Sequence, residues 1–568
     1  MAPSTRSRFE FAITSLSIAF ALTACHSEAM TPPNTAQPPQ TSNASDSPNS
    51  VSGDTYYVDC SRKKNGDGTR AAPFNALSSV NALALVPGDR VLFRRGSTCY
   101  GELRPTGSGS SAAPIVVDAY GFGPQPVIDQ KANPAHDEAI LLSDQEYWEI
   151  RNLEIIGGYT YGILVAGSAP NRRLHHFHFV NLNLHGTHNH GGTSHPFLSG
   201  EISIYPQGVH EVTSDVLIDG VEAHDSPGKV GIWISVGGHY TEVVAECQRV
   251  PTPPRYLGSD IVVRNSTVYN ISGAGIIMAF LNNGLMEDNV VYNTGVPRGD
   301  NGGVSMWEQC AHTATIQNNE AYLAHTTTPY DGGDFDIDLY NDTNILQYNY
   351  GHDADGYCIG TVGDTVAPDE SNTVRYNVCS NNARNATIAP EGEINCSGAP
   401  GVNHWQIYNN TFYFNPAIPS AAFIILGDFH LKNGVIKNNI IYSTQSQMMQ
   451  IVAKNFRLDN NIYWAAESAG APSWQWNRFT YVGLPAFQAG TGQDEHSFNS
   501  DPMLVSPTYH GDLRPTSAFT LKPNSPARGT GANLCKGVPG CSMGKRDFFG
   551  NPLPDGRGYD IGADQAPR

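Results

Sequence analysis

The chain has 568 residues, 40% of them hydrophobic, and a formal net charge of −19. This apolar content is ample for a large core, and the negative charge argues against nucleic acid and anionic membrane surfaces as partners. It also disfavours a polyanionic substrate, unless cations or local basic clusters bridge the two. The 57 glycines and 38 prolines are typical of a turn-rich β protein.

The first 25 residues have the pattern of an export signal. Arg6 and Arg8 supply positive charge, and the apolar run that follows, residues 11–22, is short for a membrane-spanning helix. The run leads into Leu-Thr-Ala-Cys, ending at Cys25, which resembles a bacterial lipobox. The resemblance implies cleavage before Cys25, lipidation of its thiol, and an exported protein held at the outer membrane or cell surface by lipid alone. An ordinary signal peptide with a chance cysteine is the alternative.

Two segments lie between the export signal and the central repeats. Residues 26–53 are rich in proline, serine, threonine and asparagine, which predicts a disordered tether. Residues 54–130 contain the strand patterns TYYVDC and RVLFRRG, with apolar residues at helical spacing over 74–85 between them. A helix of this kind can cover the open end of a solenoid, so we expect 54–130 to form an N-terminal cap.

Short segments such as EIRNLEI, MEDNVVYN and IKNNIIY recur along the middle of the chain, each alternating polar and apolar residues around an asparagine. Most steps between successive asparagines are 22 to 33 residues, which is the period of a solenoid, and the alternation makes its unit a strand. We expect equivalent asparagine side chains to stack inside the protein and to hydrogen-bond along a ladder. The residues concerned are Asn152, Asn181, Asn265, Asn289, Asn319, Asn349, Asn377, Asn410, Asn439 and Asn461.

These repeats resemble right-handed parallel β-helix proteins, the pectate-lyase-like superfamily of polysaccharide lyases and glycoside hydrolases. The resemblance implies an all-β, single-domain solenoid with coils over residues 131–464 and an irregular C-terminal cap over 465–568. We expect a monomer that acts on polysaccharide. The resemblance specifies the fold better than the reaction, because one fold hosts many chemistries.

A second recurrent segment predicts one strand per coil in a single parallel sheet. Its copies are VGIWISV, GIIMAF, GVSMWEQ, DFDIDLY, GYCIGTV and ATIAPEG. Alternation directs one set of apolar side chains inward and the intervening set toward solvent. The outward set comprises Trp233, Ser235, Ile277, Ala279, Ser305, Trp307, Asp336, Asp338, Cys358, Gly360, Ile388 and Pro390. Trp233 and Trp307 would then be exposed platforms for sugar rings, unless a loop covers each of them.

Asp336 and Asp338 are the sharpest chemical signal in the sequence. At positions i and i+2 of one strand, their side chains share a face roughly 6–7 Å apart. Two carboxyl groups in a groove split their pKa values, so that one serves as acid and the other as base, and this separation is nearer the inverting than the retaining range of glycosidases. Glu308, Asp355 and Glu391 are further candidates, while Asp355 and Asp331 are also ordinary turn residues.

Two other functions fit the same residues. Asp336, Asp338 and Asp331 supply carboxylate oxygens of the kind that bind Ca²⁺. In calcium-dependent lyases of this fold a nearby arginine or lysine removes the proton next to a uronate carboxylate, and Arg298 and Arg384 flank the predicted sheet. A non-catalytic glycan-binding surface protein is the third possibility. We favour a hydrolase, with a Ca²⁺-assisted lyase as the alternative.

Nine cysteines follow Cys25, and in an exported protein most of them should be paired. A Cys60–Cys99 disulfide would staple the N-terminal cap, and a Cys535–Cys541 disulfide would close a small loop. Sequence separation alone suggests the pairs Cys247–Cys310 and Cys379–Cys396, which leaves Cys358 free.

Overall fold

The computed structural model describes residues 53–188, 199–228, 230–237, 240–248, 255–296, 303–363, 369–398, 402–425, 431–509, 511, 517–538, 541–554 and 558–567. Cys25, the predicted signal and tether, and Arg298 lie outside these ranges. The predictions on those residues therefore stay predictions.

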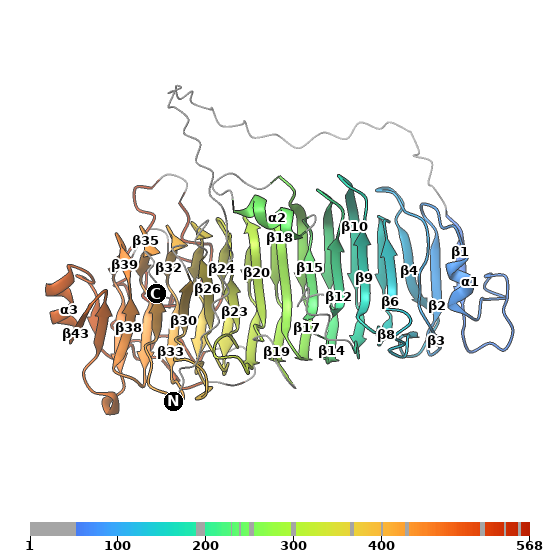
Figure 1. Cartoon of the computed structure of the whole chain (residues 1–568). Helices are drawn as coiled ribbons and strands as arrows, with labels where there is room; N and C mark the ends of the chain where they lie inside the picture. The colour runs from blue at the N-terminus through green and yellow to red at the C-terminus, as the bar shows by residue number, and fades with distance from the viewer. Residues whose placement is uncertain are drawn as a thin grey trace, which may run out of the picture. The chain divides into compact units, whose positions relative to one another are not determined.

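The chain winds as a parallel β-helix, in which most coils contribute one strand to each of three ladders (Figure 1). One coil runs through β20 (Met306–His312), β21 (Thr315–Gln317) and β22 (Glu320–Ala324) before β23 (Phe335–Ile337) starts the next. β23 pairs in parallel with β20, and Phe335 lies opposite Met306. Short strands joined by turns suit this arrangement, because each turn redirects the chain from one ladder to the next.

The first ladder contains β6 (Glu138–Ser143), β9 (Tyr161–Gly167), β12 (Gly200–Pro206), β15 (Val230–Ser235), β18 (Ala274–Glu287), β20, β23, β26 (Ile359–Gly363), β30 (Ile394–Gly398), β34 (Phe423–Ile425), β38 (Gln447–Ile451) and β42 (Ser473–Trp476), with β43 (Phe479–Val482) antiparallel at its end. The second contains β1 (Thr55–Val58), β2 (Arg90–Arg94), β4 (Ile115–Tyr120), β7 (Trp148–Arg151), β10 (Arg173–Val180), β13 (Val212–Asp219), β16 (Gly258–Arg264), the second half of β18, β21, β24 (Ile345–Gln347), β28 (Thr373–Arg375), β32 (Gln406–Tyr408), β36 (Val435–Lys437) and β40 (Arg457–Asp459).

The third ladder contains β3 (Thr98–Tyr100), β5 (Val127–Asp129), β8 (Glu154–Ile156), β11 (Asn183–His185), β14 (Glu222–Ser226), β17 (Thr267–Ile271), β19 (Val290–Thr294), β22, β25 (Tyr350–His352), β29 (Val378–Ser380), β33 (Thr411–Phe414), β37 (Ile440–Ser443), β41 (Ile462–Ala465) and β44 (Phe498–Asn499). A small fourth ladder joins β27 (Asp369–Glu370), β31 (Val402–Asn403), β35 (Leu431–Lys432) and β39 (Ala453–Lys454).

The core lies inside the coils and follows the predicted alternation over much of the first ladder. Ile232, Ile276, Met306 and Phe335 form one inward row and are 1% exposed or less. The alternation fails in two segments. Cys358, expected outward, lies in the core beside Cys379, because β26 begins only at Ile359. ATIAPEG precedes the strand of its coil, β30, which begins at Ile394. Ile388 and Pro390 therefore lie in the preceding loop and not on the outer face of the sheet.

The asparagine ladder is confirmed over seven coils. From Asn319 onward, each side-chain Oδ1 accepts hydrogen bonds from the backbone N–H and the amide of the asparagine one coil earlier, as at Asn319 and Asn349, where both distances are 3.0 Å. The ladder comprises Asn289, Asn319, Asn349, Asn377, Asn410, Asn439 and Asn461, all buried.

Asn152, Asn181 and Asn265 are not in this ladder. They lie one position earlier in their coils, at the corner between the second and third ladders, with φ between 52° and 59°. Asparagine is among the few residues that adopt this left-handed backbone readily, so a different requirement selects it there. Asn181 donates from its side-chain amide to Asn152 Oδ1 at 2.6 Å, outside the core.

Helices and the C-terminal segment complete the solenoid. The predicted N-terminal helix is present but covers only α1 (Leu77–Asn81), which lies beside β1 at one end, whereas α3 (Leu484–Thr491) and β43 lie at the other (Figure 1). α2 (Tyr240–Cys247) interrupts the coils. No helix in the described part of the chain has both the length and the apolarity to cross a bilayer.

The C-terminal segment runs back along the coils instead of only closing their end. Phe519 and Ile561 are buried in one cluster with Tyr350, Val378 and Ile440 of the third ladder. This cluster lies on the outer side of that ladder, because its residues alternate with inward ones such as Cys379 and Ile441.

Four disulfides are formed within the described residues. The predicted pairs Cys60–Cys99, Cys247–Cys310 and Cys535–Cys541 are all present. The pair Cys379–Cys396 is wrong, because Cys379 in the third ladder bonds to Cys358, which directly precedes the first-ladder strand β26 of the same coil. Cys396 is therefore the free cysteine, and it is buried.

Candidate functional site

The outer face of the first ladder carries a cluster of carboxyl groups around β23, which we call the carboxyl cluster: Asp331, Asp336, Asp338 and Glu391. Asp336 lies in β23 opposite Trp307 of β20 and Gly360 of β26. Asp331 comes from the loop before β23, Asp338 directly follows the strand, and Glu391 comes from the loop before β30. Four acidic residues from two coils, one of them on a rigid strand, thus share one surface.

Tyr357 organises the centre of the cluster. Its hydroxyl donates a 2.9 Å hydrogen bond to Asp336 Oδ2. Two glycines make room for its ring, since a Cβ atom at Gly333 or Gly360 would lie 2.1 or 2.3 Å from ring carbons. The phenol is therefore positioned by close backbone approach.

The carboxyl groups of the cluster favour the protonated form. Burial and the neighbouring charge of Asp338 hold the pKa of Asp336 well above its usual range. Burial raises the pKa of Asp338 to about 7, and it also raises the pKa of Asp331. For Glu391, burial and the charge of Asp331 raise the pKa to about 8. Acidic groups in this state can hold a proton near neutral pH and deliver it to a leaving group.

Aromatic side chains adjoin the carboxyl cluster on the same face. Tyr205, Trp233, Ile277, Trp307 and Tyr357 belong to one buried apolar cluster. Trp233 and Trp307 are only 5% and 8% exposed, and Trp233 stacks on Tyr205 with ring centroids 5.2 Å apart. The exposed indole platforms expected from the sequence are thus not present, although Trp307 does lie beside Asp336.

Glu308 does not join the carboxyl cluster. In the register of the first ladder it lies between Met278 and Ile337, on the inward side of β20. It is 1% exposed, and burial raises the pKa of its carboxyl group to about 8. Alternation explains the outcome, because Trp307 points outward and its successor must point inward.

Asp355 and Arg384 occupy structural roles near the site. Burial opposes ionisation of Asp355, but hydrogen bonds from His325 and the Thr326 N–H outweigh it and hold its pKa below the usual range. Such an acceptor within a turn matches ordinary turn chemistry better than proton transfer. Arg384 is exposed, and its guanidinium donates to the Asn415 carbonyl oxygen.

The arrangement of the carboxyl cluster also bears on the calcium prediction. Among the described residues, Asp331, Asp336 and Asp338 do not form a set of three whose donor oxygens all lie within 4.8 Å of one another. Calcium sites gather six to eight oxygens at about 2.3–2.6 Å from the ion. A Ca²⁺ site at these three residues would therefore require side-chain movement.

Sequence reasoning missed three buried polar residues in and below this face. Tyr357 directly precedes Cys358, and the alternation that places Cys358 outward predicts that Tyr357 points into the core. Asp334 is fully buried just before β23, and Glu393 is fully buried just before β30; burial raises the pKa of both carboxyl groups, that of Glu393 to about 8. The density of acidic residues in DGGDFDID was the one signal that pointed to Asp334.

The comparisons with known proteins agree with the geometry of the fold. The family model described as "Right handed beta helix region" matches residues 138–321. The GH136 lacto-N-biosidase from Eubacterium ramulus is 25% identical, with a TM-score of 0.51 over 64% of each chain. The chain thus spans less than two thirds of that enzyme's length. No curated protein sequence matches the chain.

Two lyases are more distant in structure. Pectate lyase Pel9A is 15% identical, with a TM-score of 0.38 over 91% of this chain and 98% of its own. Alginate lyase from Paenibacillus sp. str. FPU-7 is 14% identical, with a TM-score of 0.32 over 68% and 94%. At these values neither bears on the reaction. Together with the three parallel ladders, the family match confirms the predicted right-handed parallel β-helix.

Proposed function

We propose that this protein is a glycoside hydrolase that cleaves a neutral glycan, with Asp336 and Asp338 as its acid/base pair. The observation that carries the proposal is the carboxyl cluster on the outer face of the first ladder, where burial and the charge of Asp338 raise the pKa of Asp336 well above its usual range and burial raises the pKa of Asp338 to about 7. A pair that holds one proton can supply both a general acid and a general base.

The surroundings of the pair support hydrolysis over elimination. Elimination of a uronate needs a basic residue to remove a proton and a positive charge to neutralise the substrate carboxylate. Among the described residues, no lysine, arginine or histidine forms a salt bridge with its four carboxyl groups. The carboxylate of a uronate would meet no cationic side chain among these contacts, whereas a neutral sugar needs none.

Lacto-N-biosides are the first substrates to test, because the GH136 lacto-N-biosidase is similar in fold and sequence. The purified chain is incubated with a chromogenic lacto-N-bioside, with a panel of neutral glycans and with pectate and alginate. Product release is followed by chromatography, and ultraviolet absorbance reports unsaturated uronates. Hydrolysis of a neutral glycan supports the proposal, whereas unsaturated products would identify the protein as a lyase and refute the proposal.

Variants then assign the residues. Asp336→Asn and Asp338→Asn keep size and shape, and each should lower kcat by about 10²–10⁴-fold, the usual contribution of a general acid or base. Asp501→Asn is the matched control, because Asp501 is exposed and its Oδ1 accepts the Met503 N–H, which asparagine also allows. Wild-type turnover in both cluster variants would refute the assignment. Glu308→Gln should retain activity, since Glu308 points into the core.

A further inference from the structure

A second group of polar side chains lies on the outer face of the second ladder, far from β23 in the coil sequence. β10 contributes His176 and His178, which project outward because Phe177 and Phe179 between and after them are fully buried. In the neighbouring strand β7, Glu149 lies opposite His178 in register. On the other side, Asp215 of β13 lies level with His176, between the paired positions 175–214 and 177–216.

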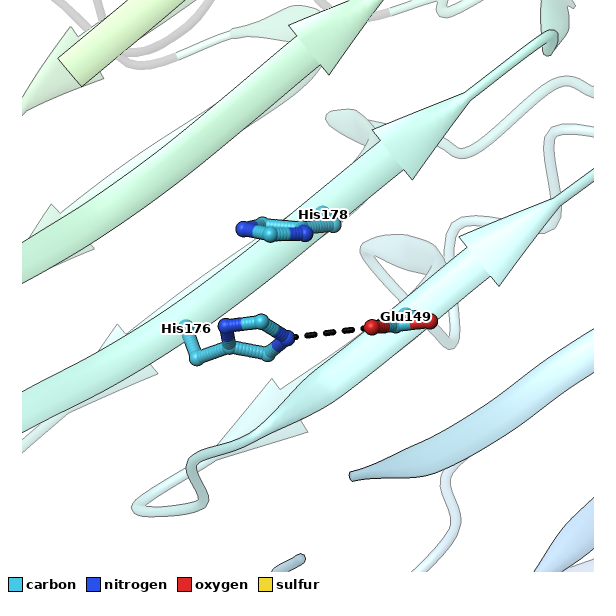
Figure 2. A group of neighbouring side chains, drawn as sticks. All are labelled: Glu149, His176 and His178. Carbon is cyan, nitrogen blue, oxygen red and sulfur yellow. Dashed lines mark hydrogen bonds and ion pairs between the residues drawn. The ribbon is translucent and has the colours of Figure 1, made fainter. Parts of the chain in front are cut away.

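The four side chains converge on one spot, as Figure 2 shows for Glu149, His176 and His178. His176 Nε2 lies 3.1 Å from Glu149 Oε1, and His176 Nδ1 lies 2.8 Å from Asp215 Oδ2. His178 Nε2 lies 3.1 Å from Asp215 Oδ1. Each of Glu149, His176 and His178 offers a donor atom within 4.8 Å of those of the other two.

The contacts of His176 leave an unmet requirement. A neutral imidazole carries one N–H, so it can donate to only one of two carboxylates. With Nδ1–H donating to Asp215, the Nε2 lone pair would face the Glu149 carboxylate. The Arg151 guanidinium donates to the other oxygen, Glu149 Oε2, and so does not relieve this contact. A second proton or a metal cation between Nε2 and Oε1 would make it favourable.

The chemistry of these donors matches a divalent metal of the zinc type. Imidazole nitrogen and carboxylate oxygen are its common ligands, at about 2.0–2.2 Å from the metal. Donor atoms around such an ion are about 3.3 Å apart, close to the present 3.1 Å between His176 Nε2 and Glu149 Oε1. The side chains of Glu149, His176 and His178 are 11%, 18% and 21% exposed, which shelters the site but leaves a side open to water.

We propose that Glu149, His176 and His178 bind a divalent zinc-type cation, with Asp215 as a positioning residue that orients the imidazoles. A carboxylate that accepts from the far nitrogen of a ligating histidine fixes its tautomer and ring direction. The cation would join β7 to β10, in successive coils, while Asp215 adds the next coil. In a solenoid, where each coil contacts only its neighbours, such a clip stabilises the interfaces between coils. The site does not depend on the proposed hydrolase activity.

The test uses the full chain after chelator treatment and dialysis. Co²⁺ is titrated while its visible absorption is followed, and Zn²⁺ binding is measured by calorimetry. The wild type should bind one more equivalent of metal ion than the His176→Gln/His178→Gln variant. Zn²⁺ should also raise the melting temperature of the wild type more than that of the variant. His185→Gln is the matched control, because His185 also pairs with a carboxylate, Glu154, at 3.3 Å but on the third ladder; it should bind as the wild type does.

Two single variants keep the test decisive if the double variant misfolds. Glu149→Gln should lose the same equivalent. Asp215→Asn, which suits the left-handed backbone at that position (φ 55°), should keep the site with affinity lowered by about 10–100-fold. Equal stoichiometry and affinity in the wild type and Glu149→Gln would overturn the proposal and leave a protonated histidine network.

Discussion

The asparagine ladder can be tested in its middle, at Asn377. Replacing it with leucine keeps the approximate shape of the side chain and removes the amide. Asn377 Oδ1 accepts two hydrogen bonds of 3.0 Å, from the backbone N–H and from the side-chain amide of Asn349. Leucine leaves both buried donors unpaired, and each orphan costs about 1–3 kcal/mol. We therefore expect the free energy of unfolding to fall by about 2–6 kcal/mol.

That loss is large against the usual stability of a folded domain, about 5–15 kcal/mol. Urea unfolding followed by tryptophan fluorescence and circular dichroism measures it. Asn499→Leu is the control, since Asn499 is exposed in β44, and its change should stay within about 0.5 kcal/mol. A loss below about 1 kcal/mol in Asn377→Leu, at an unchanged denaturant slope, would refute the reasoning that the buried amides hold the coils together.

Two further predictions concern the core and the membrane anchor. Burial raises the pKa of Glu308 from 4.5 to about 8, so the folded chain keeps a proton that the unfolded chain releases; stability should fall as pH rises across this window. Glu308→Gln should flatten that fall and raise the melting temperature at pH 8 more than at pH 5. Glu467→Gln, at an exposed position, should do neither. Parallel plots of melting temperature against pH for the wild type and Glu308→Gln would contradict the raised pKa of Glu308. Cys25→Ser should move the protein from the membrane fraction to the soluble one, with its circular dichroism spectrum unchanged; fractionation identical to wild type would reject the lipobox.

The repeat could be predicted from the sequence, but the exact position of each asparagine at the corner of its coil could not. Two adjacent positions at this corner suit asparagine for different reasons: one needs a left-handed backbone, and the next, in the later coils, needs a buried amide. Where the chain has a pair, as at Asn438 and Asn439, both positions are filled. Where only one asparagine is present, as at Asn265, the residue type does not say which position it holds, and only the register does.

The candidate site shows the same division between pattern and detail. Alternation from Phe335 and Ile337 was enough to place Asp336 on the outer face, and the same rule places Glu308 inside. Residue type alone had suggested Glu308 as a catalytic acid. The burial of Trp233 and Trp307 depends on side chains from several coils, which no local pattern encodes. Likewise, Glu149, His176 and His178 come from two coils and carry no motif spacing, so only the register brings them together.

The returning C-terminal segment changes how this solenoid should lose its structure. Coils that touch only their neighbours can melt one after another from either end. Here Phe519 and Ile561 share a cluster with side chains of β25, β29 and β37, which come much earlier in the chain. One strap thus makes several late coils gain or lose order together, whereas the coils from β1 to β13 have no residue in that cluster. During synthesis on the ribosome, the outer apolar side chains of these late coils stay uncovered until the C-terminal segment has emerged.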